Sequence, residues 1–169
     1  RSADRVEALP DRRHFILGFR LCLSQTPVEQ PTPGQPWSVP TGSIEMLWCK
    51  PGTFMKGSLE NEKDRNDDET QHRVTLTKGF YLGKYEVTQA QWTKVMGKNL
   101  SNFKGNDLPV EMVSWEDVIG FCQKLTEIEH AAGRIPDDWK YTLPTEAQWE
   151  YACRAGTTTA YAFGNTMTA

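Results

Sequence analysis

Histidine, which can bind metals and move protons near neutral pH, occurs at only three positions in this sequence. His14, His72 and His130 fall on three separate predicted elements, and no two have the i, i+4 spacing that places ligands on one helix face. This spread argues against a three-histidine metal site. His72 begins a strand, where a hydrogen-bonded structural role is expected, and His130 lies near a helix C-terminus, where a cation suits the helix dipole.

The cysteines are also dispersed. Cys22, Cys49, Cys122 and Cys153 are too widely spaced for a disulfide framework, and no pair has the C-x-x-C spacing of a zinc or redox site. Cys122 and Cys153 fall on the apolar faces of two predicted helices, where a buried thiol behaves as a small hydrophobic group. We therefore expect both to be structural.

The most acidic stretch, Glu60–Glu69, resembles a calcium loop only in part. Asp64, Asn66 and Asp68 fit the first, third and fifth ligand positions. The sixth position is Glu where the sharp turn needs Gly, and the twelfth is Thr where a bidentate Glu belongs. The pattern favours a solvated loop, with a weak cation site of another kind as the alternative.

Motifs for nucleophilic or phosphate chemistry are missing from the sequence. No G-x-S-x-G turn exposes a serine, and no glycine-rich phosphate loop follows a predicted strand. The residues by themselves therefore support no catalytic group and no cofactor.

Composition narrows the partners. The 169 residues include 38% hydrophobic and 24% charged side chains, which suits one sizeable apolar core. A net charge of −3, with scattered lysines and arginines, provides no basic surface for nucleic acid. No apolar run reaches the roughly 18 residues of a membrane span. Nothing in the sequence indicates a cellular compartment.

Strands and helices alternate with long loops. Ile44–Cys49 and Thr53–Gly57 are predicted strands around a Lys50–Gly52 turn, and two more are predicted at 72–77 and 80–87. Three helices are predicted to start at capping boxes, which are Thr88 with Gln91, Ser114 with Asp117, and Thr145 with Gln148. This order predicts an α+β domain with short strands, two to three capped helices and much irregular structure.

The apolar faces of the second and third helices can be read from their spacing. The second helix carries a stripe that ends near Gly133, and the third carries a face that ends at Gly156. The stripe consists of Val118, Phe121, Cys122, Leu125 and Ile128, and the face consists of Trp149, Ala152 and Cys153. Both faces are expected to be buried.

Residues 25–43 are predicted to form a semi-rigid linker. Five prolines fall in this stretch, interleaved with Gln, Thr and Gly, and such a sequence forms neither a helix nor a central strand. Residues 1–24 are therefore not obliged to pack against residues 44–169.

Five sequence blocks resemble the N-terminal half of the formylglycine-generating-enzyme (sulfatase-modifying-factor) family. They read GTFMKGS from Gly52, YEVT from Tyr85, LPV from Leu108, VSWED from Val113 and LPTEAQWEYA from Leu143. The resemblance implies a C-type-lectin-like α+β fold. It also implies the family activity, which is oxidation of a sulfatase cysteine to formylglycine.

The opening residues resemble the closing segment of the same family domain. This implies that residues 1–24 end one domain, 25–43 link it to the next, and 44–169 form the N-terminal part of a second domain whose C-terminal part lies outside the sequence. A tandem array explains this order, and a circular permutant is the alternative. Neighbouring family domains are then partners within the same chain.

Copper(I) and calcium enter only through the resemblance. Family oxidases bind copper(I) with two cysteines near the closing segment, and Ser2 occupies the place of one of them, in Arg1–Arg5. A hydroxyl cannot replace a soft thiolate ligand. The resemblance therefore leaves the oxidase activity doubtful, and the alternative is a non-catalytic, lectin-like binding or scaffold domain for a protein or peptide. A sulfoxide-synthase relative is a third reading, but it needs histidines from a partner domain.

Overall fold

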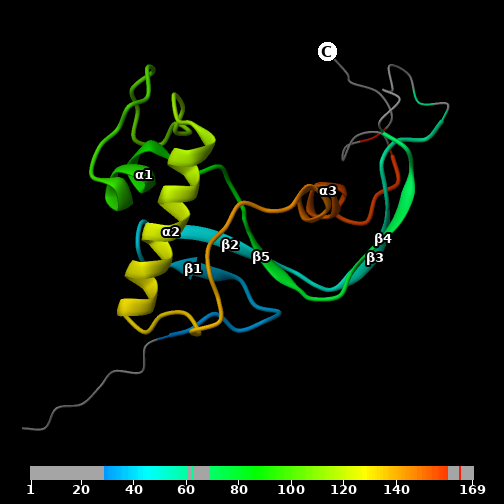
Figure 1. Ribbon diagram of the computed structural model, residues 1–169, viewed down its shortest axis with the longest axis horizontal. Helices are drawn as coiled ribbons and strands as arrows, with labels where there is room; N and C mark the ends of the chain where they lie inside the picture. The colour runs from blue at the N-terminus through cyan, green and yellow to red at the C-terminus, as the bar shows by residue number, and fades with distance from the viewer. Residues whose placement is uncertain (1–28, 61, 63–68, 160–163, 165–169) are drawn as a thin grey trace, which may run out of the picture.

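The computed structural model describes residues 29–60, 62, 69–159 and 164 (Figure 1). The chain order is β1 (Trp37–Val39), β2 (Ile44–Cys49), β3 (Gly52–Lys56), β4 (His72–Leu76) and β5 (Phe80–Gly83), followed by α1 (Gln89–Met96), α2 (Trp115–Ala131) and α3 (Glu146–Arg154). Strands come first and helices second, so the predicted α+β class is confirmed. Among the described residues, no helix is long and apolar enough to span a membrane.

The strands form two antiparallel sheets, β1-β2-β5 and β3-β4, which follow one another as a long ribbon with a bend between them (Figure 1). β2 pairs with β5 and β3 pairs with β4, so the two strands flanking the predicted Lys50–Gly52 turn do not pair with each other. Cys49 faces Phe80 and Gly52 faces Leu76, which leaves one extra residue on the returning strand. The ladder is interrupted at this mismatch, and the ribbon bends there (Figure 1).

Gly79 permits the bend. A Cβ atom at this position would lie 2.2 Å from Cζ2 of Trp48, so any side chain would collide with the indole. The Trp48 ring in turn meets Tyr81 edge-on, with centroids 5.1 Å apart. Glycine is therefore required where the two halves of the ribbon meet.

All three predicted capping boxes are present. At each helix start the hydroxyl of the cap accepts from a backbone N–H, while the side chain three residues on accepts from the N–H of the cap. Thr88, Ser114 and Thr145 are the caps. Gly133 has a φ of +66°, so the predicted left-handed end of the second helix is also confirmed.

One apolar core lies between β1, β2, α1 and α2, which together with β5 we call the body. It consists of Val39, Ile44, Trp92, Val95, Phe121, Cys122 and Leu125. The rings of Trp92 and Phe121 stack nearly parallel, with centroids 5.1 Å apart. The predicted stripe of α2 faces this core, with Val118 and Ile128 partly buried against it.

The remaining elements, β3, β4 and α3, form an arm at the far end of the ribbon (Figure 1). The prediction that Trp149 and Cys153 are buried is wrong, because both are exposed and α3 has no fully buried residue. A different face of the helix contacts β3: Tyr151 meets Phe54 edge-on, with ring centroids 5.3 Å apart. Spacing identified an apolar face, but the helix packs through the neighbouring one.

The predicted linker of residues 25–43 is partly folded. β1 lies inside it as an edge strand paired only with β2, and its Val39 is fully buried. Prolines exclude a central strand, but the three residues of β1 fit between Pro36 and Pro40 at a sheet edge. Thr41 is also held, because its hydroxyl accepts a 3.0 Å hydrogen bond from Arg134.

Candidate functional site

Ser2, which the resemblance puts in the place of a copper ligand, lies outside the described residues, as do residues 1–24 as a whole and Cys22. The calcium-loop positions Asp64, Asn66 and Asp68 also lie outside them. In the described part of the chain, no three His, Cys, Asp or Glu side chains are grouped closely enough to hold a metal ion. The roles predicted for Ser2 and for the calcium-loop positions are therefore tested by metal-binding and activity measurements.

The two described histidines make hydrogen bonds to backbone carbonyl groups. Nδ1 of His72 lies 2.9 Å from the Thr70 carbonyl, and Nε2 of His130 lies 3.1 Å from the Pro136 carbonyl. The structural role predicted for His72 is consistent with this contact. His130 links the end of α2 to the loop that follows it.

The described cysteines are on three different elements. Cys122 is buried in α2, Cys49 is half-buried in β2, and Cys153 is exposed on α3. Burial raises the pKa of the Cys122 and Cys49 thiols, so both favour the neutral form. The structural role predicted for Cys122 agrees with its burial, whereas Cys153 does not share it.

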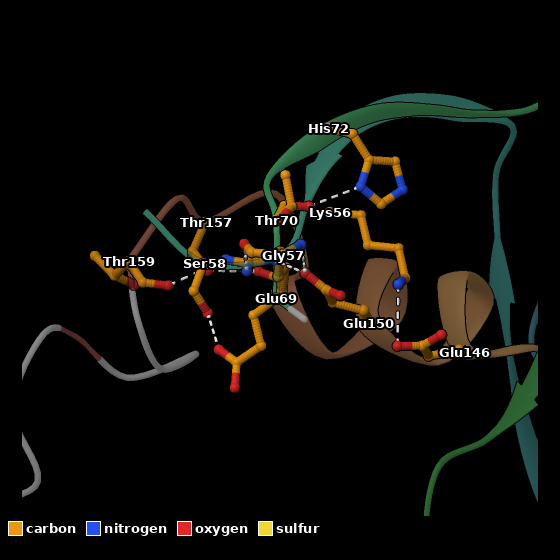
Figure 2. A network of polar contacts seen from close by, with 11 residues as sticks. Lys56, Gly57, Ser58, Glu69, Thr70, His72, Glu146, Glu150, Thr157 and Thr159 are labelled. Atoms are coloured by element: carbon orange, nitrogen blue, oxygen red, sulfur yellow. Dashed lines mark hydrogen bonds and ion pairs between the residues drawn. The ribbon is translucent and has the colours of Figure 1, made fainter. Parts of the chain in front are cut away.

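A polar network fixes the arm (Figure 2). The Gly57 N–H and Arg154 Nε both donate to one oxygen of Glu150, at 2.9 and 2.8 Å, and Arg154 Nη2 donates to the Gly57 carbonyl at 2.9 Å. Gly57 has a φ of +94°, and a Cβ atom there would lie 2.7 Å from the Glu69 carbonyl oxygen. The network therefore clamps α3 to the end of β3 at a position that only glycine fits.

Two further contacts belong to the arm network. The Ser58 hydroxyl donates to Glu69 at 2.6 Å, and Lys56 pairs with Glu146 at 3.0 Å (Figure 2). The charged groups of this network thus have partners within the arm itself. This arrangement suits a structural role better than a catalytic one.

The body carries a second polar network, around Gln89. This side chain is 1% exposed and makes four hydrogen bonds to the loop of residues 98–113. Its amide nitrogen donates to the Phe103 and Pro109 carbonyl groups, and its oxygen accepts from Asn99 and the Gly105 N–H. Both ends of the buried amide are satisfied, so the long loop is held in one conformation.

Large apolar side chains project from this ordered loop into solvent. Phe103 is 72% exposed, Met112 is 70% exposed and Trp115, at the start of α2, is 65% exposed. The Phe103 N–H donates to the Glu111 carboxylate at 2.8 Å, which ties the two sides of the loop together. We call residues 98–115 with these side chains the apolar loop. Exposed apolar side chains mark interaction sites where they form a contiguous patch.

A pocket of about 570 Å³ opens beside the apolar loop. Its walls come from the start of β2, the segment after β5, the first turn of α1 and the loop itself. The lining residues are Ser43, Ile44, Glu45, Lys84, Tyr85, Glu86, Thr88, Gln91, Asp107 and Pro109. Apolar, aromatic and acidic groups are therefore combined in one depression.

A family profile described as the sulfatase-modifying factor enzyme 1-like domain matches residues 35–169. The chain belongs to this family. The match confirms the resemblance that the five sequence blocks indicated, and it begins just before β1.

Several proteins resemble this member of the family. The chaperone protein LppX of Paenibacillus barcinonensis is 37% identical over 141 residues, which cover 69% of this chain and 47% of that protein. The formylglycine-generating enzyme of Mus musculus is 25% identical, over 69% of this chain and 41% of the enzyme. The chain thus spans less than half the length of these two relatives.

Solved structures confirm the family fold. The Treponema denticola variable protein 1 matches with a TM-score of 0.65 and 26% identity, over 80% of this chain and 62% of that one. PvdO from Pseudomonas aeruginosa matches with a TM-score of 0.60 and 25% identity, over 75% of this chain and 53% of that one.

Sequence reasoning missed Gln89 and the apolar loop. A signal was present, because Gln89, Trp92 and Met96 have the i, i+3, i+7 spacing of a buried helix face. A polar residue on such a face needs buried partners, and the loop of residues 98–113 supplies them.

Proposed function

We propose that this chain is a polypeptide-binding domain of the sulfatase-modifying-factor family, with the apolar loop as its contact surface. The exposure of Phe103, Met112 and Trp115 on an ordered backbone carries the proposal. Aromatic residues and methionine are enriched at protein interfaces, because aromatic rings provide large contact areas at a small entropic cost and methionine adapts to the shape of a partner. A chaperone name on a relative that is 37% identical supports the same reading.

The backbone of the loop adds support. Met112 has a φ of +58°, which is a strained conformation for a residue with a side chain. Such strain persists only where the surroundings hold it, and it gathers at binding and catalytic sites. Here the preceding residue, Glu111, is held by hydrogen bonds to Ser101 and Phe103, so the backbone that carries the apolar side chains is fixed.

The test is binding of a permanently unfolded protein. The full chain is titrated into fluorescein-labelled, reduced and carboxymethylated α-lactalbumin, and anisotropy gives the Kd. We expect Phe103→Ser with Trp115→Ser to weaken binding by about 30-fold or more, since each of the two interface anchors contributes about 1–2 kcal/mol. Equal far-UV circular dichroism spectra exclude a folding defect. An unchanged Kd in the double variant contradicts the proposal.

The competing function is the family oxidation of a sulfatase cysteine. Incubation with copper(I), oxygen and a Cys-x-Pro-x-Arg peptide separates the two functions, and we expect no aldehyde. The same proposal treats residues 1–24 as the closing segment of a neighbouring family domain in which Ser2 replaces a copper ligand. Stoichiometric copper(I) binding together with aldehyde formation would overturn the proposal of a polypeptide-binding domain.

A further inference from the structure

The pocket beside the apolar loop has a surplus of negative charge. Glu45, Glu86 and Asp107 contribute three carboxylates, and Lys84 is the lining residue with a positive charge. Lys84 is already paired with Glu45, because its ammonium group lies 2.9 Å from the Glu45 carboxylate. Glu86 and Asp107 have no hydrogen bond or ion pair with any residue that the structure describes. Two carboxylates on the pocket wall therefore remain available to a cation.

An aromatic ring lies beside these carboxylates. Tyr85 is 66% exposed and lines the pocket, and the Lys84 ammonium lies 4.8 Å from the centre of its ring. A cation near the face of a tyrosine ring is attracted by the negative charge of the π system. The pocket thus already holds one ammonium group by an ion pair and a ring contact.

The pocket and the apolar loop share two residues, Asp107 and Pro109. Asp107 and Pro109 line the pocket and flank Leu108, which is 46% exposed. The loop is fixed to the helix start here, since the Gln89 N–H donates to the Leu108 carbonyl at 2.9 Å and the Val110 N–H donates to the Val87 carbonyl at 2.9 Å. A polypeptide that contacts Leu108 of the loop therefore lies at the edge of the pocket.

We propose that the pocket takes a lysine or arginine side chain of the bound polypeptide, next to apolar residues that contact the loop. This inference rests on the proposed function and names the class of segment selected. Charge complementarity supports it, because a basic side chain meets Glu86, Asp107 and the Tyr85 ring together. The long apolar stem of the basic residue would lie against Pro109 and Ile44.

The test compares two labelled peptides of the same apolar sequence, one with a central arginine and one with citrulline, its neutral isostere. We expect the full chain to bind the arginine peptide about fivefold more tightly at low salt, from two exposed ion pairs and one ring contact. This preference should shrink as the salt concentration rises. In Glu86→Gln with Asp107→Asn, the two peptides should bind equally, and the citrulline peptide should bind as it does to the unaltered chain.

The matched control is Glu127→Gln with Asp138→Asn, which removes the same charges at exposed positions outside the pocket. It should retain the preference for arginine. Equal binding of both peptides by the unaltered chain, or a preference that survives in the pocket variant, overturns the inference while the proposed function stands. If neither peptide binds, the inference and the proposed function are both wrong. If only the arginine peptide binds, and Phe103→Ser with Trp115→Ser has no effect, the pocket is supported and the apolar loop is not.

Discussion

The body and the arm are stabilised by different interactions. Seven residues of the body form one buried apolar cluster, and the rings of Trp92 and Phe121 stack within it. The arm has no fully buried apolar residue among those described, and α3 is attached through the Glu150–Arg154 pair and the backbone of Gly57. Apolar burial is cooperative across a domain, whereas a few part-buried hydrogen bonds open locally. The two regions should therefore unfold with different free energies.

The largest effect is expected in the body. Phe121→Ala removes one ring of the stack and leaves a cavity, so we expect the free energy of unfolding to fall by about 4 kcal/mol in urea titrations. Phe103→Ala is the matched control, because that ring is 72% exposed and its loss should cost less than about 0.5 kcal/mol. Equal losses in the two variants would show that this cluster does not stabilise the body.

A smaller and local effect is expected in the arm. Arg154→Ala removes the hydrogen bonds to Glu150 and to the Gly57 carbonyl. The free energy of opening, measured by hydrogen exchange, should fall by about 1–2 kcal/mol at the Gly57 amide and stay unchanged at the Trp92 amide in α1. Lys124→Ala, an exposed change on α2, is the control. Equal loss of protection at both amides would mean that arm and body open as one unit.

The smallest change in stability is expected at the helix caps, where the same residue type caps one helix in each region. Thr88 begins α1 in the body and Thr145 begins α3 in the arm, each with a complete capping box. Replacing either by Ala should cost about 1 kcal/mol. We expect Thr88→Ala to lower the urea midpoint of the whole chain, and Thr145→Ala to increase hydrogen exchange in α3 alone. A global change from Thr145→Ala would remove the distinction between the regions.

Local features were predictable from the sequence and long-range ones were not. The capping boxes involve residues three apart, and the predicted strand Ile44–Cys49 has the same bounds as β2. Both patterns depend on residues close together in the sequence. The packing face of α3 depends on where β3 lies, and the folding of Trp37–Val39 depends on β2 as a partner. Neither partner can be identified from residue spacing.

The candidate site divides in the same way. Short sequence blocks were enough to indicate the family, because five of them occur in the family's order. The Gln89 network needs four partners between Asn99 and Pro109, brought together by the loop. The exposure of Phe103 and Trp115 follows from that loop conformation. Their residue types alone do not indicate that they face solvent.

The comparison of two tryptophans tests the central claim most directly. Trp115 beside the apolar loop is 65% exposed, and Trp149 on the arm is 58% exposed, so the two differ in place more than in exposure. The Kd for unfolded α-lactalbumin is measured for Trp115→Ser and for Trp149→Ser. We predict at least about a fivefold loss of affinity for Trp115→Ser and no change for Trp149→Ser. Equal losses in the two variants, or a loss confined to Trp149→Ser, would contradict a binding surface on the apolar loop.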